Sequence, residues 1–166
     1  MRYQRRFIDI FLLVAISFAL DQSTKWVILN EVMRPPRTIE LTGFLNLVLG
    51  FNTGVSFGLF DSVLAERQAL LAGLKLAIVA SLVVLAWYSD SVAERAGFSL
   101  IVGGALGNVF DRWRQGGVTD FIDFHWSGWH WPAFNMADVA ITTGVGFVFL
   151  AAVRSTRAAR RFRGVR

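Results

Sequence analysis

Four apolar stretches dominate the pattern of this 166-residue chain, and polar or glycine-rich segments separate them. They cover approximately residues 7–29, 68–88, 94–112 and 136–154. A helix needs about 20 residues to cross the hydrocarbon core of a bilayer, and shorter stretches suffice when polar ends reach the interface. The first two stretches meet this length outright, and the other two need a few flanking residues. The pattern predicts one all-α integral membrane domain, residues 1–166, with four transmembrane helices.

Two segments between these stretches are expected to lie outside the membrane. In residues 30–67, Pro35 and Pro36 end the helix, and the alternation from Thr38 to Thr42 is typical of a half-buried strand. Residues 44–60 are apolar and interrupted by glycines, which favours short strands or a hairpin. We therefore predict a small extracytoplasmic β-rich cradle on the membrane surface, and a second outer loop at residues 113–135.

The arginines gather at the two ends of the chain, and this fixes the expected topology. Arg2, Arg5 and Arg6 precede the first apolar stretch, and six more arginines follow the last. Positive residues flank spans on the cytoplasmic side, so both termini are expected in the cytoplasm, which requires an even number of spans. The short link at residues 89–95 carries a single arginine and adds little to this argument. The net charge of +5 thus indicates membrane topology and contact with anionic lipid rather than nucleic-acid binding.

The N-terminal stretch also has features of a secretory signal peptide. Arg5 and Arg6 precede an apolar run, and Ser17 to Ala19 forms a small-x-small site. Cleavage there would leave three spans, with only the C-terminal basic cluster inside. Since the apolar character resumes through Leu29, an uncleaved first helix is the favoured interpretation.

Two aspartates, Asp120 and Asp138, stand at the edges of long apolar segments, where a lone carboxylate is costly. The expected topology brings both to the outer face. Two carboxylates that meet in a poorly solvated site do not both ionise easily, so one keeps a proton and the other can act as a base. Such a pair can activate water and protonate a carbonyl oxygen. The alternative is that each aspartate caps a helix or pairs with an arginine. Spacing alone leaves Asp123 as a rival for Asp120.

Polar residues near Asp120 and Asp138 favour a functional site over the alternative that the two aspartates are separate helix caps. Asn108 and Arg112 lie on one helix face, since they are four residues apart. Gly103 and Gly107 form a small-xxx-small pair, which permits another helix to approach closely. Asn135 precedes Asp138 by about one turn and can face the same way.

Other ionisable residues in the apolar segments have simpler interpretations. Asp21 and Lys25 are spaced as a helical ion pair, which lowers the cost of both charges and is interpreted as mainly structural. Asp111 is expected to pair with an arginine or to cap its helix. Lys75 could extend toward the interface or pair with a carboxylate across the bundle, and the sequence does not decide.

Two further patterns are interpreted as coincidental. Gly54-Val-Ser-Phe-Gly58 matches a serine nucleophile motif, which needs an α/β-hydrolase sheet that this chain is too short to form. His125 and His130 lack the spacing of a zinc-binding helix. The chain contains no cysteine, which excludes disulfides, thiol nucleophiles and cysteine-bound metals. No metal or cofactor is therefore expected.

Five motifs occur in the order and with the spacing of one known family. They are Leu20-Asp-Gln-Ser-Thr-Lys25, Phe51-Asn-Thr-Gly54, Gly103-Gly-Ala-Leu-Gly-Asn-Val-Phe-Asp-Arg112, Val118-Thr-Asp-Phe-Ile122 and Phe134-Asn-Met-Ala-Asp138. Together, over about residues 20–140, they resemble the bacterial lipoprotein signal peptidases (signal peptidase II). A single motif of this kind would be weak support, and five in register are highly specific.

The resemblance implies an aspartic endopeptidase of the bacterial cytoplasmic (inner) membrane. Such enzymes remove signal peptides from diacylglyceryl-modified prolipoproteins, cutting before the lipidated cysteine, and globomycin-type inhibitors block them. The family's catalytic dyad corresponds to Asp120 and Asp138, which decides between Asp120 and Asp123. Its supporting and substrate-binding residues correspond to Asn52, Asn108, Arg112, Asn135, Asp21 and Lys25.

Two other classes of function compete with the peptidase. A small proton-coupled transporter would also use membrane carboxylates, although it should place them near the bilayer midplane. A non-enzymatic membrane scaffold would tolerate replacement of both aspartates. The sequence leaves open the oligomeric state, the preferred precursors, the role of Lys75 and which aspartate holds the proton at rest.

Overall fold

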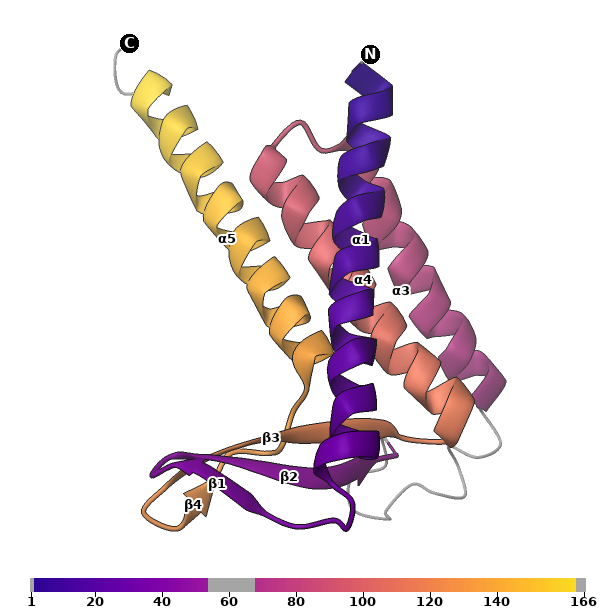
Figure 1. The fold of residues 1–166 in the computed structure, drawn as a ribbon. Helices are drawn as coiled ribbons and strands as arrows, with labels where there is room; N and C mark the ends of the chain where they lie inside the picture. The colour runs from indigo at the N-terminus through magenta and orange to yellow at the C-terminus, as the bar shows by residue number, and fades with distance from the viewer. Residues whose placement is uncertain (1, 54–67, 164–166) are drawn as a thin grey trace.

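The computed structural model describes residues 2–53 and 68–163. Its long helices are α1 (Arg2–Val27), α3 (Gln68–Tyr88), α4 (Val92–Gln115) and α5 (Met136–Arg163), and the short π-helix η1 (Ile28–Val32) continues α1. The helices extend from one side of a small sheet, and both chain termini lie at the end of the bundle away from that sheet (Figure 1). The prediction of a mostly helical protein is confirmed.

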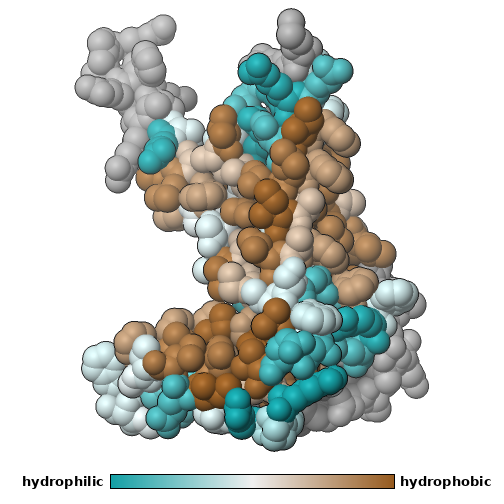
Figure 2. Space-filling model, viewed as in Figure 1, coloured by the Kyte–Doolittle hydropathy of each residue, from teal (hydrophilic) through white to brown (hydrophobic). Residues whose placement is uncertain are grey.

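The helical bundle presents apolar side chains outward. Within the described residues, two helices are long and apolar enough to cross a membrane, Tyr3–Val32 and Met136–Thr156, and Leu76–Tyr88 is a shorter apolar helix. Large exposed apolar side chains include Phe7, Phe11, Ile16 and Leu20 on α1, and Val145, Phe147, Phe149 and Leu150 on α5. Apolar surface runs along the bundle, and polar residues gather at its two ends (Figure 2). This distribution suits a lipid environment, in which outward apolar side chains face hydrocarbon.

Glycines on α4 allow the helices to approach one another closely. A Cβ atom added at Gly104 would lie 2.5 Å from the carbonyl oxygen of Ala137, and one at Gly97 would lie 2.6 Å from that of Gly144. These two glycines therefore set the contact between α4 and α5. Gly103 and Gly107 face α1 in the same way, so the predicted small-xxx-small contact is confirmed.

The sheet has four antiparallel strands in the order β1 (Ile39–Thr42), β2 (Leu45–Asn52), β3 (Val118–Trp126) and β4 (Trp129–His130). The strand predicted from Thr38 to Thr42 is therefore confirmed as β1. The segment predicted as a second outer loop, residues 113–135, contains the two strands β3 and β4. β3 pairs with β2, with Gly50 opposite Asp120 and Asn52 opposite Val118. The remainder of the predicted hairpin and the Gly54–Gly58 motif lie outside the described residues, as does the side chain of Lys75.

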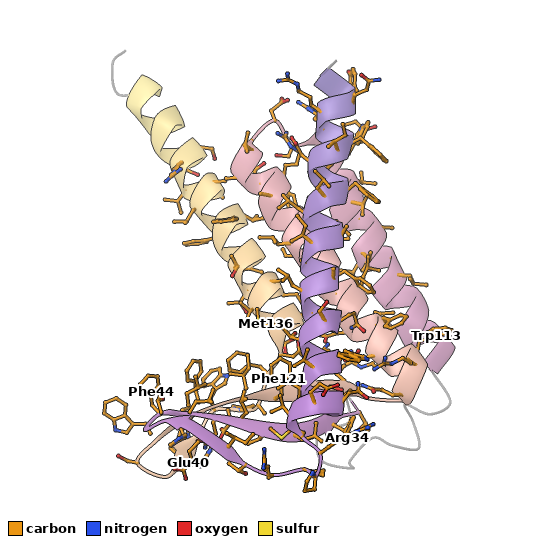
Figure 3. All side chains as sticks on the ribbon, viewed as in Figure 1. Arg34, Glu40, Phe44, Trp113, Phe121 and Met136 are labelled. Atoms are coloured by element: carbon orange, nitrogen blue, oxygen red, sulfur yellow. The ribbon has the colours of Figure 1, made fainter. Side chains whose placement is uncertain are left out.

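A compact apolar cluster joins the sheet to the helices. Ile28, Met33 and Phe121 are buried together where η1 meets β3. Partly buried side chains around them are Val32, Ile39, Leu47, Leu49, Ile122 and Met136. Phe121 and Met136 lie between the sheet and the foot of the bundle (Figure 3). The cluster therefore fixes β3 beneath the first turn of α5, and this contact positions the site.

Candidate active site

Backbone hydrogen bonds hold Asp120 and the start of α5 side by side. The backbone N–H groups of Phe121 and Ile122 donate to the carbonyl oxygen of Phe134 at 3.0 and 2.9 Å, and the N–H of Phe134 donates to Ile122 O at 3.0 Å. The residue before these N–H groups is Asp120, and the residue after Phe134 is Asn135. The turn into α5 therefore places Asn135 beside the carboxylate of Asp120.

Asp138 lies at the third position of α5 and takes part in a capping box. The N–H of Asp138 donates to Asn135 Oδ1 at 3.1 Å, and the N–H of Asn135 donates to Asp138 Oδ2 at 3.2 Å. Each residue thus satisfies a backbone donor that the helix would otherwise leave free. Asp138 therefore does cap the helix, as one of the alternatives predicted, but the cap uses only one of its two carboxylate oxygens.

The carboxylate of Asp120 is 5% exposed and accepts hydrogen bonds from two amides. Asn135 Nδ2 donates to Asp120 Oδ1 at 2.6 Å, and the side chain of Asn52 also donates to this carboxylate. Burial raises the pKa of Asp120, the hydrogen bonds from Asn135 and Asn52 lower it, and the negative charge of Asp138 raises it again. The net effect is upward, so Asp120 retains a proton more readily than an ordinary aspartate.

Asn108 on α4 connects the two halves of the site. Its Nδ2 donates to Asp138 Oδ1 at 3.0 Å, and its Oδ1 lies 3.3 Å from Asn135 Nδ2. Two asparagines therefore link Asp120 to Asp138 through short hydrogen bonds. Arg112 donates instead to the backbone oxygen of Asn108 at 3.3 Å, so its hydrogen bond does not reach either carboxylate.

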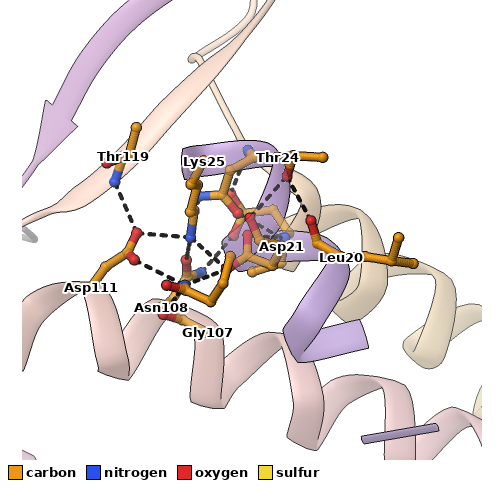
Figure 4. A network of polar contacts seen from close by, with 12 residues as sticks. Leu20, Asp21, Thr24, Lys25, Gly107, Asn108, Asp111 and Thr119 are labelled. Atoms are coloured by element: carbon orange, nitrogen blue, oxygen red, sulfur yellow. Dashed lines mark hydrogen bonds and ion pairs between the residues drawn. The ribbon is translucent and has the colours of Figure 1, made fainter. Parts of the chain in front are cut away.

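A buried ionic cluster lies next to Asn108 (Figure 4). Lys25 Nζ lies 2.8 Å from both Asp21 Oδ2 and Asp111 Oδ2, and all three side chains are at most 1% exposed. The ion pair of Asp21 and Lys25 matches its helical spacing. The expectation that Asp111 pairs with an arginine or caps its helix is wrong, because the close contact of α1 and α4 at Gly107 brings Lys25 to Asp111.

The same cluster holds the strand and the helix that carry Asp120 and Asp138. Asp111 Oδ2 accepts from the N–H of Thr119 at 3.2 Å, one residue before Asp120. Asp21 Oδ1 accepts from the N–H of Ala137 at 2.9 Å, one residue before Asp138. Asp111 therefore anchors the backbone beside Asp120, and Asp21 anchors the backbone beside Asp138.

The contacts that Asp111 and Gln22 make in this cluster were not predicted from the sequence. Gln22 Nε2 donates to Asp21 Oδ2 and Asp111 Oδ1, at 3.0 Å in both cases. The signal available for Asp111 was its position one turn after Asn108 on an apolar helix. Gln22 carried no comparable signal, since a polar residue beside Asp21 is equally consistent with a solvent-facing position.

Asp123, the rival carboxylate, belongs to a different group of residues. Asn46 Nδ2 donates to Asp123 Oδ2 at 3.0 Å, and His130 Nδ1 lies 2.9 Å from both carboxylate oxygens. Burial acts to raise the pKa of Asp123, but these hydrogen bonds and the charges of His130 and His125 lower it overall. Across residues 2–53 and 68–163, His, Cys, Asp and Glu form no group that could hold a metal ion.

The fold and the site together define a class of protein. A helical membrane protein that holds two carboxylates in one hydrogen-bonded group has the apparatus of an aspartic hydrolase, in which one acid is protonated and the other ionised. The chain belongs to the Signal peptidase (SPase) II family, whose profile matches residues 13–154. The protein is thus a membrane-bound aspartic endopeptidase that acts on lipoprotein signal peptides.

Individual relatives agree with this assignment. The chain is 43% identical over 136 residues to the lipoprotein signal peptidase of Anaplasma phagocytophilum (strain HZ), covering 82% of this chain and 85% of the relative. It is 41% identical to that of Azoarcus sp. (strain BH72), covering 86% and 81%. A solved bacterial membrane enzyme superposes with a TM-score of 0.73 at 29% identity, covering 89% of this chain and 88% of that one.

Proposed function

We propose that Asp120 and Asp138 are the catalytic dyad of this signal peptidase. The observation that carries the proposal is the short chain of hydrogen bonds from Asp120 through Asn135 and Asn108 to Asp138. A dyad in this arrangement activates a water molecule for attack on the scissile carbonyl and protonates the carbonyl oxygen, without a covalent intermediate. Asn52, Asn108 and Asn135 hold the carboxylates in position.

We infer that four helices cross the inner membrane and that both termini are cytoplasmic. The end of α1 that carries the arginines of residues 2–6 and the end of α5 that carries those of residues 154–163 lie opposite the sheet (Figure 1), consistent with a cytoplasmic end there. α4 carries its charged residues near its two ends, Glu94 and Arg95 at one and Asp111, Arg112 and Arg114 at the other, with small and apolar residues between them. The dyad and the sheet then face the periplasm.

This topology suits the proposed substrate, a diacylglyceryl-modified prolipoprotein. Its scissile bond follows a membrane-embedded signal helix and precedes a lipid-anchored cysteine, so the bond lies at the outer leaflet. The proposed dyad is at that level, with Asp120 on a strand just beyond the helices. Globomycin-type inhibitors are expected to bind here and to block cleavage.

A proton-coupled transporter is a weaker explanation for the same carboxylates. It requires acids near the middle of the bilayer, where they can be reached from either side. Asp120 lies on β3, and Asp138 lies in the first turn of α5. Both positions are at one end of the bundle, which favours chemistry at a single surface.

Cleavage of a diacylglyceryl-modified precursor by the purified protein tests the proposal. Asp120→Asn and Asp138→Asn should each lower kcat by at least about 10³-fold while the protein still folds, since loss of a general acid or base removes the main chemical assistance. Asp123→Asn is the matched control and should cleave at nearly the wild-type rate. Full activity in either dyad variant would overturn the proposal.

A further inference from the structure

Lys25 is buried among groups that satisfy all of its protons. Its ammonium has three N–H donors. The acceptors are Asp21 Oδ2 at 2.8 Å, Asp111 Oδ2 at 2.8 Å and Asn108 Oδ1 at 3.1 Å (Figure 4). The contact with Asn108 links the lysine to Asp138, and the positive charge of Lys25 also acts on Asp120, where it lowers the pKa of that carboxyl.

The lysine fixes the orientation of the Asn108 amide. An ammonium group donates hydrogen bonds and cannot accept them, so the Asn108 atom that faces Lys25 must be the oxygen. The amide nitrogen is then directed to Asp138, where Nδ2 donates to Oδ1 at 3.0 Å. Without Lys25, only the 3.3 Å contact with Asn135 Nδ2 would hold the Asn108 oxygen away from Asp138.

Asn135 is oriented by a second group that can only donate. The backbone N–H of Asp138 donates to Asn135 Oδ1 at 3.1 Å, so the amide nitrogen of Asn135 must face the other way. That nitrogen donates to Asp120 Oδ1 at 2.6 Å and lies 3.3 Å from Asn108 Oδ1. The two amides are therefore aligned head to tail, and Lys25 and the start of α5 fix their directions.

The two carboxylates differ in their surroundings. Asp138 accepts an N–H on each oxygen, from Asn108 Nδ2 and from the backbone of Asn135, and it lies in the first helical turn, where the helix dipole favours negative charge. Asp120 lies on a strand and has no helix N-terminus of its own. Burial raises the pKa of Asp120, and the charge of Asp138 adds to this effect against the hydrogen bonds from Asn135 and Asn52.

We propose that Lys25, acting through Asn108, is a positioning residue that directs an amide donor at Asp138, so that Asp138 is the general base and Asp120 the general acid. This assignment rests on the proposed function of the dyad. Among the charged groups of the surrounding elements, those joined to the site by hydrogen bonds or ion pairs are Asp120 from β3, Asp21 and Lys25 from α1, and Asp111 and Arg112 from α4.

The assignment gives a balanced hydrolysis. Asp138 takes a proton from water as the water oxygen bonds to the scissile carbonyl carbon, and Asp120 gives its proton to the carbonyl oxygen. The C–N bond of the resulting diol then breaks. Asp138 passes its proton to the leaving nitrogen, and Asp120 recovers a proton from one hydroxyl as the new carboxyl group forms.

The pH profile of kcat for cleavage of a diacylglyceryl-modified precursor tests the role of Lys25. Replacing Lys25 alone would leave two buried carboxylates without a counter-ion, so the variant is Lys25→Met with Asp111→Asn, which removes one charge of each sign. We expect kcat to fall about 10- to 100-fold with little change in KM. The acid limb of the profile should move toward higher pH, because the general base loses a fixed hydrogen-bond donor.

A second variant keeps the test decisive if the double variant does not fold. Asn108→Leu leaves Lys25 paired with Asp21 and Asp111. It removes the donor to Asp138 together with the oxygen that accepts from Lys25 and Asn135, so the same upward shift of the acid limb is expected. Ser99→Ala is the control, since it loses a buried 2.7 Å hydrogen bond to Arg95 O on the same helix outside the cluster. It should lower the thermal stability without moving the acid limb.

The outcomes separate this assignment from the proposed function. An unmoved acid limb in an active Asn108→Leu or double variant would overturn the role of Lys25 and leave the dyad intact. Full cleavage by Asp138→Asn would overturn the dyad itself. The assignment is supported if the acid limb moves in both Asn108→Leu and the double variant and stays at its wild-type position in Ser99→Ala.

Discussion

Asn135 and Asp138 cap each other at the start of α5, with reciprocal hydrogen bonds of 3.1 and 3.2 Å between side chain and backbone. The amide nitrogen left over on Asn135 reaches Asp120 at 2.6 Å. One asparagine therefore begins the helix and joins the two proposed catalytic acids. The first turn of α5 and the dyad form together.

Substitutions of Asn135 should separate these two effects. Serine keeps a side-chain oxygen for the N–H of Asp138 but is too short to reach Asp120. We expect Asn135→Ser to unfold near the wild-type temperature and to lose kcat by about 10²-fold. Asn135→Ala should lose kcat and also about 1 kcal/mol of stability, since the cap is gone. Thermal unfolding and precursor cleavage measure the two effects, and equal destabilisation by both variants would contradict this account.

The raised pKa of Asp120 predicts that the dyad costs stability at neutral pH. A carboxyl group whose pKa in the folded protein exceeds its ordinary value of 3.8 contributes most to stability below that value, and the contribution is lost as pH rises through the folded pKa. Asp120→Asn should therefore melt above wild type at pH 7. The two melting temperatures should converge near pH 4. A wild-type protein that melts above the variant at pH 7 would contradict the direction of the shift.

Asp123 should show the opposite pH dependence and no effect on catalysis. Its pKa is lowered overall in the folded protein, so its contribution is present above the ordinary value of 3.8 and is lost as pH falls through the folded pKa. Asp123→Asn should be less stable than wild type at pH 7, and the difference should shrink on acidification. Thermal unfolding across this pH range, combined with the cleavage rate, distinguishes Asp123 from Asp120.

Two glycines of α5 provide a matched test of the contact between α4 and α5. A Cβ atom at Gly144 would lie 2.5 Å from the backbone oxygen of Gly97, whereas Gly146 has open space within 4 Å. Gly144→Ala should cost about 1–3 kcal/mol by forcing the helices apart. Gly146→Ala should be neutral or slightly stabilising, because alanine favours the helix. Unfolding measured in the same detergent compares the two, and equal effects would show that the contact is not tight.

Local sequence patterns were sufficient for features that depend on neighbouring residues. The lengths of the apolar stretches indicated the helices, and the spacing of Asp21 and Lys25 indicated their ion pair. The hydrogen bonds of Asp138 show that helix capping and membership of the site, first considered as alternatives, occur at the same residue.

Features that depend on helix crossing or strand pairing could not be predicted in this way. Lys25 contacts Asp111 because glycines on α4 let α1 approach closely. No pattern of neighbouring residues predicts the distance between these two helices. β3 lies in the segment that was expected to be an outer loop between the last two apolar stretches. Pairing with β2 and bonds to Asn135 and Asn46 satisfy the carboxylates of Asp120 and Asp123 within the strand.

The hydrogen bond from Ala137 to Asp21 joins positions that are 116 residues apart. The groups that hold the dyad, Asn52 and Lys25, are made early in translation, whereas Asp120 and Asp138 are made late. A nascent chain that stops before α5 has the supports and lacks half of the dyad. Since the proposed dyad needs Asp138 from α5, it can be complete only after the last helix has joined the bundle.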